Sequence, residues 1–114
     1  MPKTDLELAR HAAHRGAILR TLKEDYGPEM TTLRVLQRAL DVQGVSLSAE
    51  DLEFHLTYLS DQAYVSIKRA RDLPGFRTDR PGAVKPSAIL MAKLLPSGLQ
   101  LLDGLIPEDP SVTF

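Results

Sequence analysis

Basic side chains that could bind phosphate groups gather in one part of the sequence, residues 64 to 95. This part holds seven Lys or Arg residues against two Asp residues, a local excess of +5, whereas the whole chain of 114 residues has a net charge of −1. Such a cluster is typical of a surface that contacts nucleic-acid phosphates. Solvated charges on a polar loop are the alternative, with Asp72 and Asp79 neutralising two of the cations. The residues expected to contact a DNA backbone are Lys68, Arg69, Arg71, Arg77, Arg80 and Lys85.

Two aromatic residues, Phe54 and Tyr58, lie one turn apart on the expected outer side of a helix over residues 48 to 61. This helix contains no Lys or Arg, and its outer side also holds Asp61 and other carboxylates, which phosphate groups would repel. One interpretation is that both aromatic rings pack under the first or the last helix. The other is an exposed aromatic patch with an acidic rim formed by Phe54, Tyr58 and Asp61, which suits a protein partner or a homodimer interface.

The sequence offers little for catalysis or metal binding. His11 and His14 are three residues apart and could meet on one side of a helix, but no cluster of carboxylates lies beside them, and His55 borders an apolar stripe. The chain has no Cys, no glycine-rich phosphate loop and no nucleophile elbow. We therefore expect no enzyme, no catalytic residue, no metal site, no cofactor and no small-molecule substrate.

The elements expected to position these residues form one α+β domain over residues 1–114. Apolar spacing and capping residues predict a helix from Thr4 or Asp5 to Asp25, a second helix that Thr31 or Thr32 caps and Gly44 ends, and a third from Ser48 to Asp61. Alternation then predicts a strand over residues 64–71. After a long loop, a segment that is apolar on both faces apart from Lys93 predicts a returning strand over residues 87–95, and a short helix over residues 97–104 precedes a tail that contains two prolines. The expected fold is a winged helix-turn-helix: residues 1–30 are the N-terminal helix, 31–63 the helix-turn-helix, 64–95 the wing hairpin, and 96–114 the short helix and tail. The wing sheet has two or three antiparallel strands, to which residues 44–47 could add a brief edge strand.

The first helix has three features that leave alternatives open. Its buried stripe is expected to hold Leu8, Ala12, Leu19, Leu22 and Tyr26. Arg15 lies inside the stripe, so either its stem covers the core while the guanidinium reaches solvent, or it has a specific acidic partner. Gly16 in mid-helix costs about 1 kcal/mol relative to Ala and marks a close approach of another helix or a bend.

The C-terminal segment resembles one family. In the small winged-helix proteins encoded in Mu-like prophages, the second wing strand runs into a Leu-Thr-x-x-Gly-x-x-Leu-Leu turn and helix. The residues that match here are Leu94, Leu95, Gly98, Leu101 and Leu102, followed by Gly104, Pro107 and Phe114. Leu95 replaces the hydroxyl residue that would cap this helix, which leaves its start to Ser97 or without a cap. The resemblance implies a winged-helix fold and a phage or prophage origin. Because DNA binding is the default expectation for a winged helix, we expect a phage-type DNA-binding or regulatory protein; a protein-interaction or assembly module is the alternative.

Composition limits the compartment and the partners. The absence of Cys fits a reducing environment, and no apolar run has the length of a signal peptide or a membrane span. We therefore expect a soluble, cytoplasmic protein that does not bind membranes. Its candidate partners are double-stranded DNA, a second copy of the chain, or a phage protein.

Overall fold

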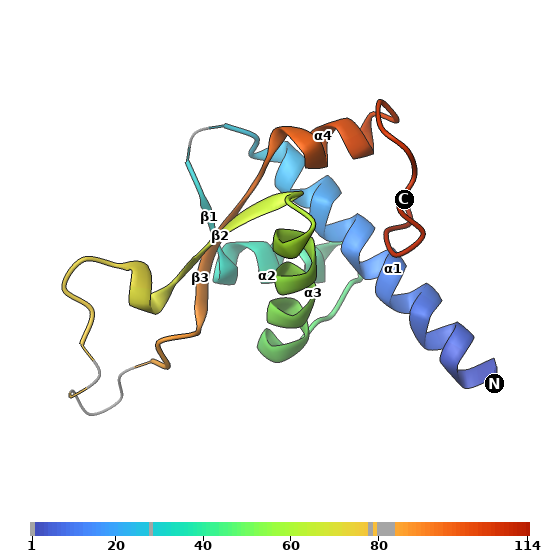
Figure 1. The fold of residues 1–114 in the computed structure, drawn as a ribbon. Coiled ribbons are helices and arrows are strands. Elements are labelled where there is room, and N and C mark those ends of the chain that lie inside the picture. The colour runs from blue at the N-terminus through green and yellow to red at the C-terminus, as the bar shows by residue number, and fades with distance from the viewer. Residues whose placement is uncertain (1, 28, 78, 80–83) are drawn as a thin grey trace.

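The computed structural model describes residues 2–27, 29–77, 79 and 84–114. Within these residues the fold is α+β, with four α-helices, a short 3-10 helix and a three-stranded antiparallel sheet (Figure 1). The elements in chain order are α1 (Pro2–Glu24), β1 (Thr31–Thr32), α2 (Leu33–Val42), α3 (Ala49–Asp61), β2 (Val65–Arg69), the 3-10 helix η1 (Ala70–Asp72), β3 (Ile89–Leu94) and α4 (Pro96–Leu102).

The helix ends follow the local signals of the sequence. The hydroxyl of Thr32 accepts a hydrogen bond from the backbone N–H of Val35 (3.3 Å), and the hydroxyl of Ser48 accepts one from Asp51 (3.1 Å). These contacts satisfy N–H groups that have no partner inside the first turn. Gly44 follows α2 with a φ of 85°, a conformation that glycine adopts without steric cost. The predicted caps of α2 and α3 are therefore confirmed.

The sheet has the order β1-β3-β2, with β3 in the centre. Val65 of β2 pairs with Leu94 of β3, and Thr31 of β1 pairs with Ala92 from the other side. Both hairpin strands are shorter than expected, because the chain turns into η1 after Arg69 and β3 begins only at Ile89.

The edge strand expected at residues 44–47 is wrong. These residues fold back on α2 instead: the N–H of Val45 donates to the carbonyl of Leu40 (2.9 Å), and the carbonyl of Leu47 accepts from the side chain of Gln37 (2.7 Å). These backbone groups therefore form hydrogen bonds with α2 and not with a strand, and the third strand of the sheet is β1.

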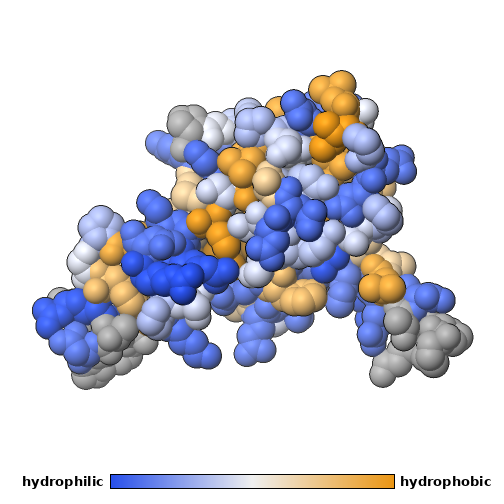
Figure 2. All heavy atoms as spheres, viewed as in Figure 1, coloured by the Kyte–Doolittle hydropathy of each residue, from blue (hydrophilic) through white to orange (hydrophobic). Residues whose placement is uncertain are grey.

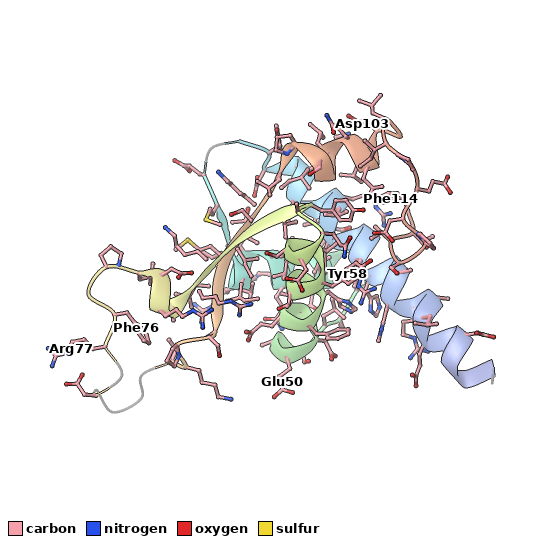
Figure 3. The ribbon with its side chains drawn as sticks, in the orientation of Figure 1. Glu50, Tyr58, Phe76, Arg77, Asp103 and Phe114 are labelled. Atoms are coloured by element: carbon pink, nitrogen blue, oxygen red, sulfur yellow. The ribbon has the colours of Figure 1, made fainter. Side chains whose placement is uncertain are left out.

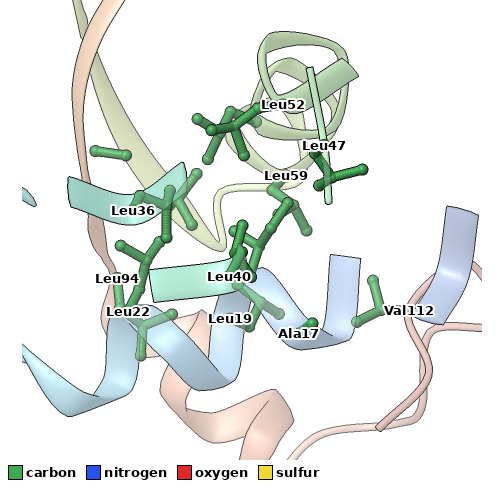
Figure 4. Packing of buried hydrophobic residues seen from close by; sticks show 14 of the residues in the cluster. Ala17, Leu19, Leu22, Leu36, Leu40, Leu47, Leu52, Leu59, Leu94 and Val112 are labelled. Carbon is green, nitrogen blue, oxygen red and sulfur yellow. The ribbon is translucent and has the colours of Figure 1, made fainter. Parts of the chain in front are cut away.

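The core lies between the sheet and the three long helices (Figure 4). Fully buried leucines come from one face of each helix, and Val65, Ala92 and Leu94 face them from the sheet. The helical members are Leu19 and Leu22 of α1, Leu36 and Leu40 of α2, and Leu52, Leu56 and Leu59 of α3.

The predicted buried stripe of α1 is confirmed only for its middle residues. Leu8 is 61% exposed because the N-terminal end of α1 projects beyond the rest of the domain (Figure 1). Tyr26 is 47% exposed because the helix ends at Glu24, so the helical spacing no longer applies to it. Ala12, Leu19 and Leu22 are buried as expected.

Candidate functional site

The outer face of the sheet carries lysines. Val65 and its partner Leu94 face the core, so the next pair, Ser66 and Lys93, points away from the core, as does Lys68 with its partner Met91. Lys93 is not among the residues that the sequence predicts to contact a DNA backbone. Its position between buried Ala92 and Leu94 nevertheless places it on this face. Figure 2 shows hydrophilic side chains gathered beside β2.

Arg69 has a structural role in the hairpin. Its guanidinium donates a hydrogen bond to the carbonyl of Ser87 (2.6 Å), which joins the two arms beyond the sheet. Its backbone N–H donates to the carboxylate of Asp72 (2.9 Å). Asp72 therefore caps η1 instead of neutralising a cation of the hairpin, and part of the hydrogen-bonding capacity of Arg69 is already used.

Arg77 is paired with Asp79. Two hydrogen bonds, of 3.0 Å from Nε and 2.7 Å from Nη2, join the guanidinium to the carboxylate at the tip of the loop. This hydrogen bonding raises the pKa of Arg77 and lowers the pKa of Asp79. Asp79 neutralises Arg77, as one alternative predicted. Arg80 lies outside the described residues.

The other cations of the hairpin that the structure describes have no such partner. Arg71 and Lys85 are exposed, and Lys68 and Lys93 are partly exposed on the sheet. Within the part of the chain that the structure describes, none of these four forms an ion pair with a carboxylate. They are the basic groups best placed to bind an external anion.

Helix α3 carries carboxylates, one of which contacts the hairpin. Glu53 accepts a hydrogen bond from the backbone N–H of Ile89 (3.2 Å) and thereby connects α3 to the start of β3. Glu50, Asp51 and Asp61 are exposed (Figure 3 labels Glu50 at the start of α3). The sign of the surface charge therefore changes between the hairpin and α3.

The two aromatic residues of α3 have different surroundings. Tyr58 is partly buried: its hydroxyl donates to the carboxylate of Asp109 (3.2 Å), and the guanidinium carbon of Arg15 lies 3.9 Å from the centre of its ring. Phe54 is 53% exposed and touches the rings of His11 and His55. Both rings lie towards α1, as one interpretation predicted, but only Phe54 keeps a large exposed surface. Asp61 is exposed at the end of the helix.

Arg15 matches neither alternative derived from the sequence. It is buried, with 8% of its surface exposed, and its Nη1 donates to the carbonyl of Ser111 (3.3 Å). Burial lowers its pKa, whereas Tyr58 and Asp109 oppose this change. Its main partners are thus an aromatic face and a backbone carbonyl.

The C-terminal tail, residues 105–114, packs along α1 and α3. The hydroxyl of Tyr64 also donates to Asp109 (3.0 Å), and burial followed by this bond raises the pKa of Tyr64 to about 12, so the phenol remains a donor. The N–H of Thr113 donates to the carbonyl of Ala12 (2.9 Å). The carbonyl of Thr113 lies against Gly16, where a Cβ would overlap it. Gly16 therefore marks a close approach, but of the tail and not of another helix.

Three histidines meet between α1 and α3. The ring of His55 lies 5.2 Å from that of His11 and 5.8 Å from that of His14. Within the described residues, no group of three His, Cys, Asp or Glu side chains is placed to hold a metal ion. Burial, followed by the charges of Arg15, His11 and His14, lowers the pKa of His55 to about 4.

Comparison with family models, with curated proteins and with solved structures gave no match for this chain. Among the described helices, none combines the length and apolar character needed to cross a membrane.

Proposed function

We propose that this chain is a winged-helix protein that binds double-stranded DNA, mainly through contacts of its wing with the phosphate backbone. The wing is the segment from β2 through η1 and the loop to β3, residues 65–94. The element order supports the proposal: three helices precede the hairpin, and a short strand before α2 pairs with the returning strand β3. In winged helices the third helix enters a groove or lies over it, and the wing reaches the backbone.

The wing cations without carboxylate partners carry the proposal. Lys68, Arg71, Lys85 and Lys93 present positive charge on one hairpin, and neutralising phosphates with such residues releases counterions. Contacts of this kind are independent of sequence, and they typically give dissociation constants of about 10⁻⁴ to 10⁻⁶ M at physiological salt.

The acidic surface of α3 argues against reading bases with this helix. Glu50, Asp51 and Asp61 are exposed, and α3 contains no Lys or Arg that could bind a guanine or a phosphate. Deep insertion of α3 into the major groove would bring these carboxylates close to phosphates. We therefore propose that DNA contacts the wing, while α3 remains outside the groove.

Reversing two wing charges is expected to weaken DNA binding. The variant Arg71→Glu/Lys85→Glu should bind every duplex sequence less tightly, because it loses two phosphate contacts. The slope of log K against log salt should decrease in magnitude by about 2, or about one per lost contact. Fluorescence anisotropy with a random-sequence duplex at several salt concentrations measures both effects.

The control variant is Arg20→Glu/Arg38→Glu, which changes the net charge equally on exposed sites of α1 and α2. It should bind nearly as well as the unmodified protein. An equal loss in both variants would reveal a general charge effect and contradict binding by the wing. Absence of binding at low salt would contradict the DNA proposal itself.

A protein-interaction module is the second candidate, and the half-exposed ring of Phe54 favours it. An aromatic residue beside exposed carboxylates suits a protein partner or a second copy of the chain. Phe54→Ala should then change the molar mass measured by light scattering, whereas Tyr58→Ala would also disturb the contacts with Asp109 and Arg15. If the unmodified protein and the Phe54→Ala variant are both monomers, a homodimer at this surface is excluded.

A further inference from the structure

The N-terminal half of α1 is attached to α3 largely through polar and aromatic groups. After Gly16, α1 buries Ile18, Leu19 and Leu22 completely, whereas before it Leu6 and Leu8 are exposed. The groups before Gly16 that face α3 are mainly His11, His14 and Arg15. The attachment of the first half of α1 therefore depends on these contacts and on the tail, whereas the second half is held mainly by buried apolar side chains.

His55 is at the centre of this contact. Its side chain is only 2% exposed, and its Nδ1 is buried without a hydrogen-bond partner among the described residues. Its ring contacts the rings of His11, His14 and Phe54 edge to face. An uncharged imidazole fits such a site, whereas a charged one is costly where it is neither solvated nor paired.

The charged groups around His55 are mostly cations. From α1 it faces His11, His14 and Arg15, with Arg10 beside His14. Among the described residues, Asp51 of α3 is the carboxylate whose charge favours the protonated form of His55. The charge of Asp109 in the tail raises the pKa of Arg15. The loop before α3 contributes Ser46 and Leu47, which carry no charge, to the pocket of 540 Å³ that His55 also lines.

We propose that His55, with the rings of His11 and His14 packed against it, forms a proton-operated catch, which holds the N-terminal half of α1 on α3 while His55 is neutral and releases it when His55 becomes charged. The released state would expose more of the rings of Phe54 and Tyr58, and the second half of α1 would stay in the core. This device does not depend on the DNA-binding proposal.

The direction of the pKa change gives the pH range. The pKa of His55 is about 4 when α1 is docked, below its ordinary value of 6.5, and burial and the charge of Arg10 and His11 also lower the pKa of His14. A depressed pKa means that the docked state is favoured above pH 6.5 and loses this advantage as the pH falls from 6.5 towards 4. A difference of two and a half pH units corresponds to a total change in the docking equilibrium of up to about 300-fold, of which less than about a hundredfold is reached by pH 4.5.

Amide hydrogen exchange, corrected for the intrinsic pH dependence of exchange, tests the catch. Between pH 7 and 4.5, protection factors over residues 5–14 should fall by up to about a hundredfold, while residues 17–24 keep theirs. The ring protons of His55, followed by NMR, should titrate well below those of an unfolded chain.

Three variants separate the catch from general acid sensitivity. His55→Leu should remove most of the pH dependence over residues 5–14. His14→Gln should reduce the loss of protection, because it removes a cationic neighbour of His55. Asp51→Asn should increase the loss at a given pH, because it removes the favourable carboxylate.

Several results would overturn the proposal. They are an ordinary pKa for His55, equal loss of protection in both halves of α1, or an unchanged response in His14→Gln and Asp51→Asn. The last two variants alter partly or fully exposed side chains, so they decide the outcome even if His55→Leu does not fold.

Discussion

Replacing Asp109 with alanine is expected to lower the free energy of unfolding by about 2–3 kcal/mol, which is large for a residue in a tail without regular structure. The carboxylate accepts hydrogen bonds from the hydroxyls of Tyr58 and Tyr64 and from the backbone N–H of Ser111 (2.8 Å). Its loss leaves two partly buried hydroxyls without their acceptor. It also removes the negative charge that favours the buried guanidinium of Arg15.

Urea unfolding of Asp109→Ala and of the neighbouring variant Glu108→Ala measures this effect. Glu108 is exposed and makes no hydrogen bond within the described residues, so its replacement should change stability by less than about 0.5 kcal/mol. A double-mutant cycle with Tyr58→Phe should give a coupling energy of about 1 kcal/mol, because the variants remove the same hydrogen bond. Equal stability of the Asp109 and Glu108 variants would show that the tail contributes little.

Gly98→Ala is expected to destabilise the domain by about 2 kcal/mol, although alanine favours helices by about 1 kcal/mol over glycine. Gly98 lies in α4, and a Cβ at this position would overlap the carbonyl of Tyr64 and come within 2.7 Å of the Leu94 side chain. The same carbonyl accepts a hydrogen bond from the N–H of Leu95 (2.9 Å), so it cannot move without loosening the start of α4.

Gly27→Ala provides the matched control, because a Cβ there would meet its nearest atom at 3.9 Å, an ordinary contact. Thermal unfolding should show a lower midpoint for Gly98→Ala and a nearly unchanged midpoint for Gly27→Ala. An unaltered midpoint in the Gly98 variant would mean that α4 moves aside without cost.

Local signals predicted most of the helical part of the fold. The caps at Thr32 and Ser48 act within three residues of their partners, so their role is visible in the sequence itself. The edge strand β1 has two residues, too few to show any alternation, and only its pairing with β3 defines it. That strand was therefore placed in the wrong segment.

The candidate site was only partly predictable, because its contacts join distant parts of the chain. Arg15 and Ser111 are separated by 96 positions, and Tyr58 and Asp109 by 51, so no local pattern relates them. The two prolines of the tail correctly indicated irregular backbone, but irregular backbone can still pack, as buried Val112 does. The concentration of basic residues in the hairpin was recognisable from composition, whereas the pairing of Arg77 with Asp79 and the position of Lys93 required the three-dimensional arrangement.

The bond between Thr113 and Ala12 affects how the chain can fold during its synthesis. Residues near the N-terminus emerge first from the ribosome, yet part of their native surroundings is supplied by residues 109–113 about a hundred positions later. Contacts with such a large sequence separation form late, because a long loop must close first. The helices and the hairpin can associate as they emerge, but Arg15 and Gly16 reach their final environment only when residue 113 has left the exit tunnel.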